Sequence, residues 1–348
     1  MSVLDKMKQQ APEMWAECAP EIAQRVAFSK SGQYLPLQRI QSDTDRFNEL
    51  MCQRWHGAFN AYQVALNYCR HEGVSLYNQE KDEAHRNSDF KFRAVSTLHA
   101  NSCVAAHAVL LLLQAGLAQE ALNKWRSMFE FSCFAVLLRK GDQELAERYI
   151  LHAHVEDAKM LELEEAELQQ NEKSYNKSTY DSCYERRDEL IEKYGKSYNT
   201  PYGWAVDATQ NKSPQIKDIV RAAGFYQYMS EHKAASMSLH GSFDAIYNIS
   251  TPPSLHMKLW GPSSYGIAQA AEQSLLMLLL STVDFLNLRS SRDVFVAMEV
   301  IEALIVRAQD MFASIEKQIM QLGELNSFGE KHPSPPSGEG PDSKAELD

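Results

Sequence analysis

Three groups of polar and ionisable side chains lie inside stretches whose remaining residues predict packed helices. Burying an ionisable group costs free energy unless the group is paired, so each cluster either locks a helical core or takes part in chemistry. Their members are Arg126 and Glu130 in the first group, Glu147, Arg148, His154 and Lys159 in the second, and Ser236 and His240 in the third.

Arg126 and Glu130 are four residues apart, a spacing that places both side chains on one face of a helix. Trp125, Phe129 and Phe134 crowd the same stretch, so we expect the pair to be partly buried. The pair is then a structural ion pair that faces the second group. The alternative role for Arg126 is to receive an anionic ligand, together with Arg148 and Lys159.

The second group forms two adjacent stripes, because a helix turns by about 100° per residue. Arg148 and Lys159 return to one stripe, and Glu147 and His154 share the other. Both stripes carry side chains that transfer protons or bind anions. A single helical histidine is more often a hydrogen-bonded core group, and both roles stay open for His154.

Ser236 and His240 are one helical turn apart and can share a hydrogen bond. A nucleophilic serine also needs an orienting third group and an exposed, strained turn. A position in the middle of a helix offers no such turn. The spacing therefore favours a histidine that holds two helices together over a serine hydrolase.

Metal and cofactor motifs are missing from the sequence. It has neither His-Glu-x-x-His nor Glu-x-x-His, and a helix points the rings of His152 and His154 apart. Six scattered cysteines form no Cys-x-x-Cys pair, and the N-terminal residues lack an apolar signal segment. We expect no metal, no cofactor, reduced thiols and a cytoplasmic protein.

The formal net charge of −11 argues against a general nucleic-acid-binding surface, so we expect no DNA partner. A small local basic site for RNA remains compatible with that charge. The two most apolar stretches, residues 104–117 and 275–288, are shorter than the roughly 20 residues of a membrane span. We expect buried helices there and no membrane partner.

Apolar periodicity predicts an all-α fold, an antiparallel helical bundle with an irregular insertion and a disordered C-terminal tail. Residues 1–44 read as a short helix and loop, residues 45–322 as the bundle domain, residues 171–214 as its variable insertion and residues 323–348 as the tail. The expected helices cover residues 45–71, 90–115, 118–139, 142 to beyond 165, 184–194, a stretch opened by Pro214, 225–247, 265–288 and 291–322.

Taken in order, the three groups resemble the bacterial domain-of-unknown-function family numbered 5677. That family is helical and runs from an Arg-x-x-x-Glu helix, through an acid-Arg-Tyr helix that continues to a histidine and a lysine, to a Ser-x-x-x-His helix. The resemblance covers residues from about Trp55 to Asn248. It implies no particular activity.

The five residues between Arg148 and His154 also resemble the Arg-x4–6-His signature of the helical HEPN (higher eukaryotes and prokaryotes nucleotide-binding) superfamily. Many members are metal-independent ribonucleases of toxin and phage-defence systems, and they usually act as homodimers. The resemblance implies that Arg148 stabilises the phosphorane and that His154 moves the proton of the 2′-hydroxyl. Tyr149 departs from the signature, because a polar residue often follows the arginine there.

Two kinds of function therefore stay open. One is a HEPN-like ribonuclease, which needs Arg148 and His154 together and within reach of solvent. The other is a non-catalytic binding or regulatory module, in which Glu130, Arg148 and His240 lock the core or the basic groups hold a small anion.

Overall fold

The computed structural model describes residues 35–171, 173–239, 249–250 and 261–321. Within these ranges every regular element is a helix and there is no strand, which confirms the all-α prediction. The expected tail, residues 323–348, lies outside the described residues. The chain divides into two compact units, Met1–Arg54 and Trp55–Asp348.

The helices differ widely in length. They are α3 (Leu35–Arg86), α4 (Phe90–Gln114), α5 (Ala118–Lys140), α6 (Gln143–Leu151), α7 (Ala153–Gln170), α8 (Lys177–Tyr194), η1 (Lys196–Asn199), η2 (Gly203–Ala205), α9 (Val206–Thr209), α10 (Ile216–Ala223), η3 (Tyr226–Tyr228), α11 (Met229–Leu239), α12 (Ile267–Leu286) and α13 (Arg292–Gln321).

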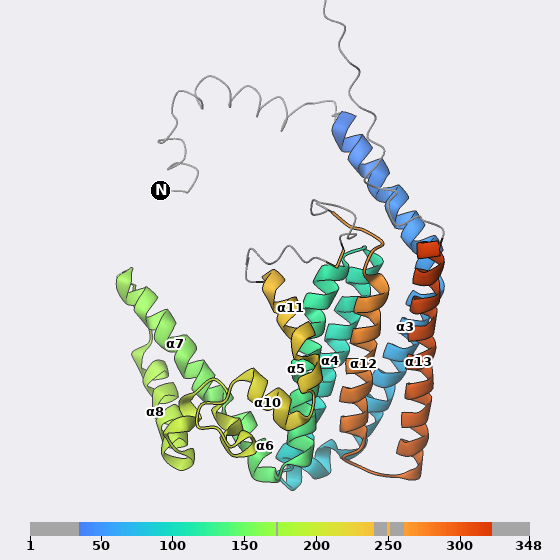
Figure 1. Cartoon of the computed structure of the whole chain (residues 1–348). Coiled ribbons are helices and arrows are strands. Elements are labelled where there is room, and N and C mark those ends of the chain that lie inside the picture. Colours follow the sequence, from blue (N-terminus) through green and yellow to red (C-terminus); the bar gives the residue numbers. More distant parts are fainter. Residues whose placement is uncertain (1–34, 172, 240–248, 251–260, 322–348) are drawn as a thin grey trace, which may run out of the picture. The chain divides into compact units, whose positions relative to one another are not determined.

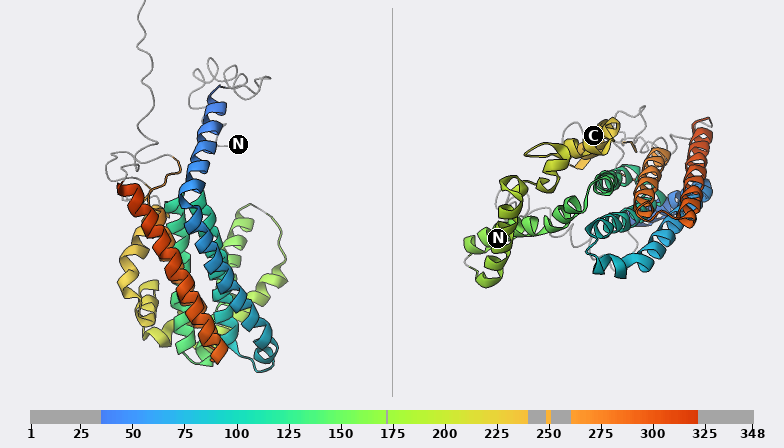
Figure 2. Two further views of the ribbon diagram at one scale, coloured as in Figure 1. Left: turned by 90° about the vertical axis from the view of Figure 1, so that its right-hand side faces the viewer. Right: turned by 90° about the horizontal axis from the view of Figure 1, so that it is seen from below.

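The centre of the second unit is formed by α4, α5 and α12, which all contact one another, while α13 packs on α12 (Figures 1 and 2). Only three residues, Ala115 to Leu117, join α4 to α5, so the two helices run antiparallel. Aromatic side chains of α3 and α13 meet at the far side of this core: Phe312 lies 5.8 Å from the rings of both Trp55 and Phe59. These contacts join the part of α3 after Arg54 to α13.

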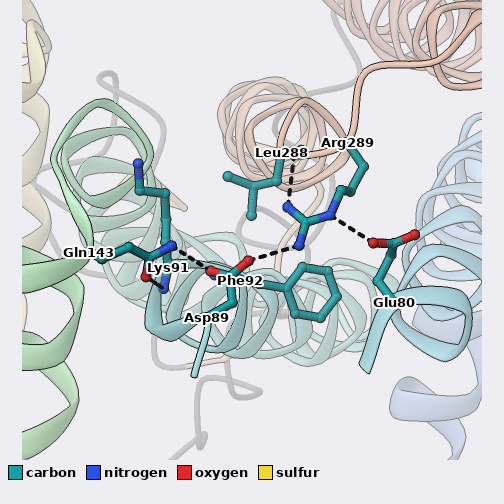
Figure 3. A network of polar contacts seen from close by, with 7 residues as sticks. All are labelled: Glu80, Asp89, Lys91, Phe92, Gln143, Leu288 and Arg289. Carbon is teal, nitrogen blue, oxygen red and sulfur yellow. Dashed lines mark hydrogen bonds and ion pairs between the residues drawn. The ribbon is translucent and has the colours of Figure 1, made fainter. Parts of the chain in front are cut away.

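Asp89 joins several helix ends in the network of Figure 3. Its carboxylate caps α4 by accepting from Phe92 N (2.9 Å), and it accepts further bonds from Gln143 Nε2 and Arg289 Nη2 (both 2.8 Å). Arg289 also donates to Glu80 through Nε at 2.7 Å. These hydrogen bonds hold the pKa of Asp89 below its usual value, although its partial burial acts in the opposite direction.

The prediction that the first long helix ends at residue 71, just before Gly73, is wrong. Helix α3 continues through Gly73 to Arg86. The glycine serves packing instead of termination, because a Cβ atom there would lie 2.2 Å from His99 Nε2. The pattern typical of a helix end therefore marks a close approach between α3 and α4.

The helix expected to start after Asp142 does start there, and Asp142 caps it by accepting from Leu145 N at 2.8 Å. It does not continue unbroken past Glu165, because it breaks at His152 into α6 and α7. The ring of His152 is buried, with Nε2 3.0 Å from the carbonyl oxygens of both Tyr198 and Thr200. The break thus lies where the insertion is anchored.

Among the described residues, α4 is long and apolar enough to cross a membrane when judged by length and composition alone. In its most apolar window, 56% is buried inside the protein, chiefly against α5 and α12. The core helix of a helical bundle meets the same criterion.

Candidate functional site

Arg126, Glu130 and His232 form a cluster between α5 and α11. Glu130 Oε1 lies 3.1 Å from Arg126 Nε and 2.9 Å from His232 Nε2. The imidazole is buried, whereas the guanidinium and the carboxylate keep 26% and 22% of their surface exposed. The cluster is therefore anchored on a buried histidine and remains open to solvent on its arginine and glutamate.

Arg126 Nε and His232 Nε2 both lie within hydrogen-bond distance of Glu130 Oε1, and both can direct a proton to it. Arg126 Nε and His232 Nε2 are also 3.2 Å apart. If Nε2 accepted a proton from Arg126, its lone pair would face the negative oxygen of Glu130 at 2.9 Å. The favourable arrangement is two donors converging on Glu130 Oε1, which places the proton of His232 on Nε2.

Ser236 lies one turn along α11 from His232, and its hydroxyl donates to the carbonyl oxygen of His232 at 2.7 Å. That bond uses the serine proton within the helix and does not bring the hydroxyl to the cluster. The other predicted member of this group, His240, lies outside the described residues.

Tyr202, at the start of the irregular segment before η2, lies within electrostatic reach of the cluster. Burial raises the pKa of its phenol, the charges of Glu130 and Glu156 raise it further, and Arg126 opposes them. Its ring packs edge-on against Phe134, one turn after Glu130 on α5. Tyr202 therefore links the Arg126 cluster to the polar face at the start of α7.

That face of α7 carries Lys159, which donates to Glu156 at 2.8 Å. Glu156 also lies 3.9 Å from His152 Nδ1. Burial lowers the pKa of His152, and the nearby carboxylate of Glu156 only partly offsets that effect. The imidazole is therefore a neutral hydrogen-bonded anchor near neutral pH.

Arg148 belongs to a separate, buried cluster. Its Nη1 donates to Asp207, whose side chain is 72% exposed, while only 7% of the arginine side chain reaches solvent. The guanidinium carbon lies 5.3 Å from the ring of Tyr194 and 5.9 Å from that of Tyr198. Arg148 Nε is buried without a hydrogen-bond partner. This arrangement joins α6 to the insertion.

The remaining members of the second group point to solvent or to surface partners. Glu147 accepts from Lys193 of α8 at 3.1 Å. His154 is exposed on the first turn of α7, whereas Arg148 is buried on α6. Among the described contacts, none joins Arg148 to His154.

Three residues of these clusters were not singled out from the sequence. His232 is one turn before Ser236, so the spacing argument applied to His240 identifies it equally well. Asp207 and Tyr202 lie in the irregular insertion, where no periodic pattern ties them to α5 or α6.

Among the described residues there is no group of three or more histidine, cysteine, aspartate or glutamate side chains that could hold a metal ion. The two arginine clusters are built from ion pairs, histidines and phenols, which are groups able to transfer protons or to bind anions.

Residues 92–253 match the sequence profile of a family of unknown function, DUF5677. This segment is similar to DUF5677, and the expected resemblance is thereby confirmed over residues 92–253. No match was found among curated proteins or among solved structures. The matched segment contains both arginine clusters and all of α4 to α11 except the first two residues of α4.

Proposed function

We propose that this protein is a non-catalytic binding or regulatory module that holds a small molecule through a phosphate or carboxylate group at the Arg126 cluster. The observation that carries the proposal is that Arg126 and Glu130 are partly exposed to solvent while the buried His232 holds the carboxylate in place. The polar contacts of Arg126 with the described residues use Nε, which donates to Glu130 and lies 3.2 Å from His232 Nε2. The two terminal nitrogens of the guanidinium are left for a bidentate anion.

Glu130 and His232 prepare Arg126 for that role. The carboxylate holds the guanidinium by Nε, and the buried imidazole holds the carboxylate. A positively charged fork whose orientation is set in advance loses less conformational freedom when it binds. Lys159 on α7 is paired with Glu156, whose charge acts on Tyr202 together with the charges of Glu130 and Arg126.

The charge balance favours a small ligand over a long polyanion. The chain carries a net charge of −11, and the carboxylate of Glu130 lies at the site itself. A polymer with many phosphates would meet this negative field at each step along the surface. A single phosphate or carboxylate meets only the local arginine.

Calorimetric titration with inorganic phosphate and with acetate at constant ionic strength tests the proposal. We expect saturable binding of at least one anion, lost in Arg126→Gln and kept in Arg186→Gln, which changes a surface arginine paired with Glu189. Equal heats for wild type and Arg126→Gln would rule out the site. Unfolding curves of the variants must overlay for the comparison to count.

A second candidate is a HEPN-like, metal-independent ribonuclease of a bacterial toxin or phage-defence system that acts as a homodimer. The geometry favouring it is the bond between His232 and Glu130, a carboxylate–histidine pair beside an arginine. In that function His232 moves the proton and Arg126 stabilises the phosphorane. Arg148 suits this role less than the resemblance implies, because Asp207 and two tyrosines enclose it.

Incubation with total RNA in excess chelator separates the two functions. The ribonuclease predicts cleavage that resists chelation and is abolished by His232→Gln and by Arg126→Gln. Binding without catalysis predicts intact RNA with every variant. His154→Gln is the matched histidine control, because His154 is exposed and outside the Arg126 cluster.

A further inference from the structure

A groove of about 580 Å³ opens between α3 and α4 and shares no residue with the Arg126 cluster. Its deep part is formed by Gly73, His99, Cys103 and Phe285, which are all buried. Its walls carry apolar side chains that remain exposed: Val74 keeps 54%, Tyr77 46% and Val104 70% of its surface in solvent. The size lies in the range of small-molecule pockets.

The groove is lined by a row of rings, those of His99, Phe285 and Tyr77. His99 stacks on Phe285 with ring centres 5.3 Å apart at 27°. Phe92 lies outside the lining, contacts Phe285 and stacks on Tyr77 at 6.1 Å and 12°. Such a surface favours a planar aromatic body, since aromatic pairs stabilise each other beyond the burial of their area.

Gly73 and His99 form part of this lining together. A side chain at Gly73 would collide with the imidazole, so the glycine lets the ring of His99 lie flat between the two helices. Burial lowers the pKa of His99 to about 4, and the ring is therefore neutral near pH 7. A neutral imidazole extends the apolar surface of the groove, whereas a charged imidazole would disfavour contact with an apolar ligand.

The rim of the groove is free of acids although the chain carries a net charge of −11. Within the described parts of the chain no aspartate or glutamate lines it, whereas Arg70 and His107 contribute basic side chains at the surface. Arg70 uses one terminal nitrogen to bond Asn67 Oδ1 at 3.0 Å. The charge of the lining therefore complements an anion placed at the Arg70 end.

We infer that this groove binds a planar aromatic molecule that carries a carboxylate. The aromatic body lies on the row formed by Tyr77, Phe285 and His99, and the carboxylate lies beside Arg70. The inference is independent of the function proposed for the Arg126 cluster, because the two sites share no residue.

Titration with 2-naphthoate, followed by its fluorescence, tests the inference in the full-length protein. Neutral 2-naphthalenemethanol and aliphatic decanoate are the reference compounds. We expect saturable binding of 2-naphthoate that is on the order of tenfold tighter than that of either reference. The reason is that 2-naphthalenemethanol lacks the charged hydrogen bond and decanoate lacks the ring stacking. Lack of saturation, or equal affinity for all three, overturns the inference.

Variants assign the binding to the groove. Arg70→Gln should weaken 2-naphthoate by on the order of tenfold, whereas Arg86→Gln, a surface change on the same helix, should leave it unchanged. Ala100→Trp and Thr97→Trp both fill the groove from exposed lining positions and should abolish binding. Val306→Trp on α13 adds the same ring at an exposed site outside the groove and should not.

A second copy of the chain is the competing occupant. If it covers the groove, sedimentation shows a dimer that Ala100→Trp dissociates, and 2-naphthoate fails to bind the wild-type protein. That result overturns the inference. Binding that survives both tryptophan variants in folded protein also overturns it, because the probe then lies elsewhere.

Discussion

His232 Nε2 lies 2.9 Å from Glu130 Oε1, although the two residues are 102 positions apart in the chain. This bond joins α11 to α5 and orients the carboxylate that holds Arg126. His232 therefore orients Arg126 indirectly, through the carboxylate of Glu130. It is the basis of the anion site proposed above.

Replacing Glu130 by Gln tests that dependence. The variant removes the negative charge on which two N–H groups converge, so we expect the free energy of unfolding to fall by about 1–3 kcal/mol. Phosphate affinity should fall as well, because Arg126 is no longer held. Chemical denaturation and calorimetry measure the two effects, with Glu189→Gln as the surface control. Unchanged stability would mean that the cluster is not formed in solution.

The pair of Arg148 and Asp207 should respond asymmetrically to substitution. Asp207→Asn leaves a buried guanidinium without its counter-charge, and we expect a loss of about 2 kcal/mol. Arg148→Met leaves only an exposed, hydrated carboxylate, and its packing is largely conserved. In the Arg148→Met background, Asp207→Asn should therefore be almost neutral.

A double-mutant cycle by denaturant unfolding measures this coupling. Equal losses for Asp207→Asn in both backgrounds would show that the ion pair contributes nothing. The same variants also test the ribonuclease function. If Arg148 contributes only to stability, Arg148→Met should not change RNA cleavage beyond its effect on folding.

The pKa of His99 predicts how stability depends on pH. Its pKa falls from 6.5 to about 4 on folding. The unfolded chain therefore binds the proton more readily, and stability is lost as the pH falls from about 6.5 to 4. The full difference is about 3 kcal/mol. His99→Gln should flatten the curve in this window. An unchanged slope in the variant would assign the dependence to other groups.

Burial predicts an order of thiol reactivity. It raises the pKa of Cys69 and of Cys103 to about 12, and that of Cys133 still further. Because the thiolate is the reactive form, these three should resist alkylation in the native protein. Cys52 is exposed and, of the cysteines that the structure describes, should be modified first. Mass spectrometry of briefly alkylated protein reads out the order, and early labelling of Cys133 would contradict the packing of α5.

The sequence predicts the bundle well because periodic apolar residues report directly on burial. The helices after Gly116 and after Ser291 are where their patterns place them. Gly73 misleads because one residue type serves two purposes, ending helices and allowing close packing, and the choice depends on His99 in another helix. The break at His152 has the same origin, since its partners Tyr198 and Thr200 lie in the insertion.

The site was predictable only in part. Arg126 and Glu130 were found because their spacing is local to one helix. His232, Tyr202 and Asp207 complete the clusters from distant segments, and no short spacing relates them to their partners. Arg148 and His154 are close in sequence, yet one is buried on α6 and the other exposed on α7, because the chain breaks between them.

Nuclear magnetic resonance of the histidine rings during a phosphate titration tests the central proposal most directly. We predict that the ring nitrogens of His232 shift and saturate, that Arg126→Gln abolishes the shift, and that exposed His154 stays unchanged as an internal reference. A His232 ring that does not move, or that moves only in parallel with His154, would contradict an anion site at Arg126, Glu130 and His232.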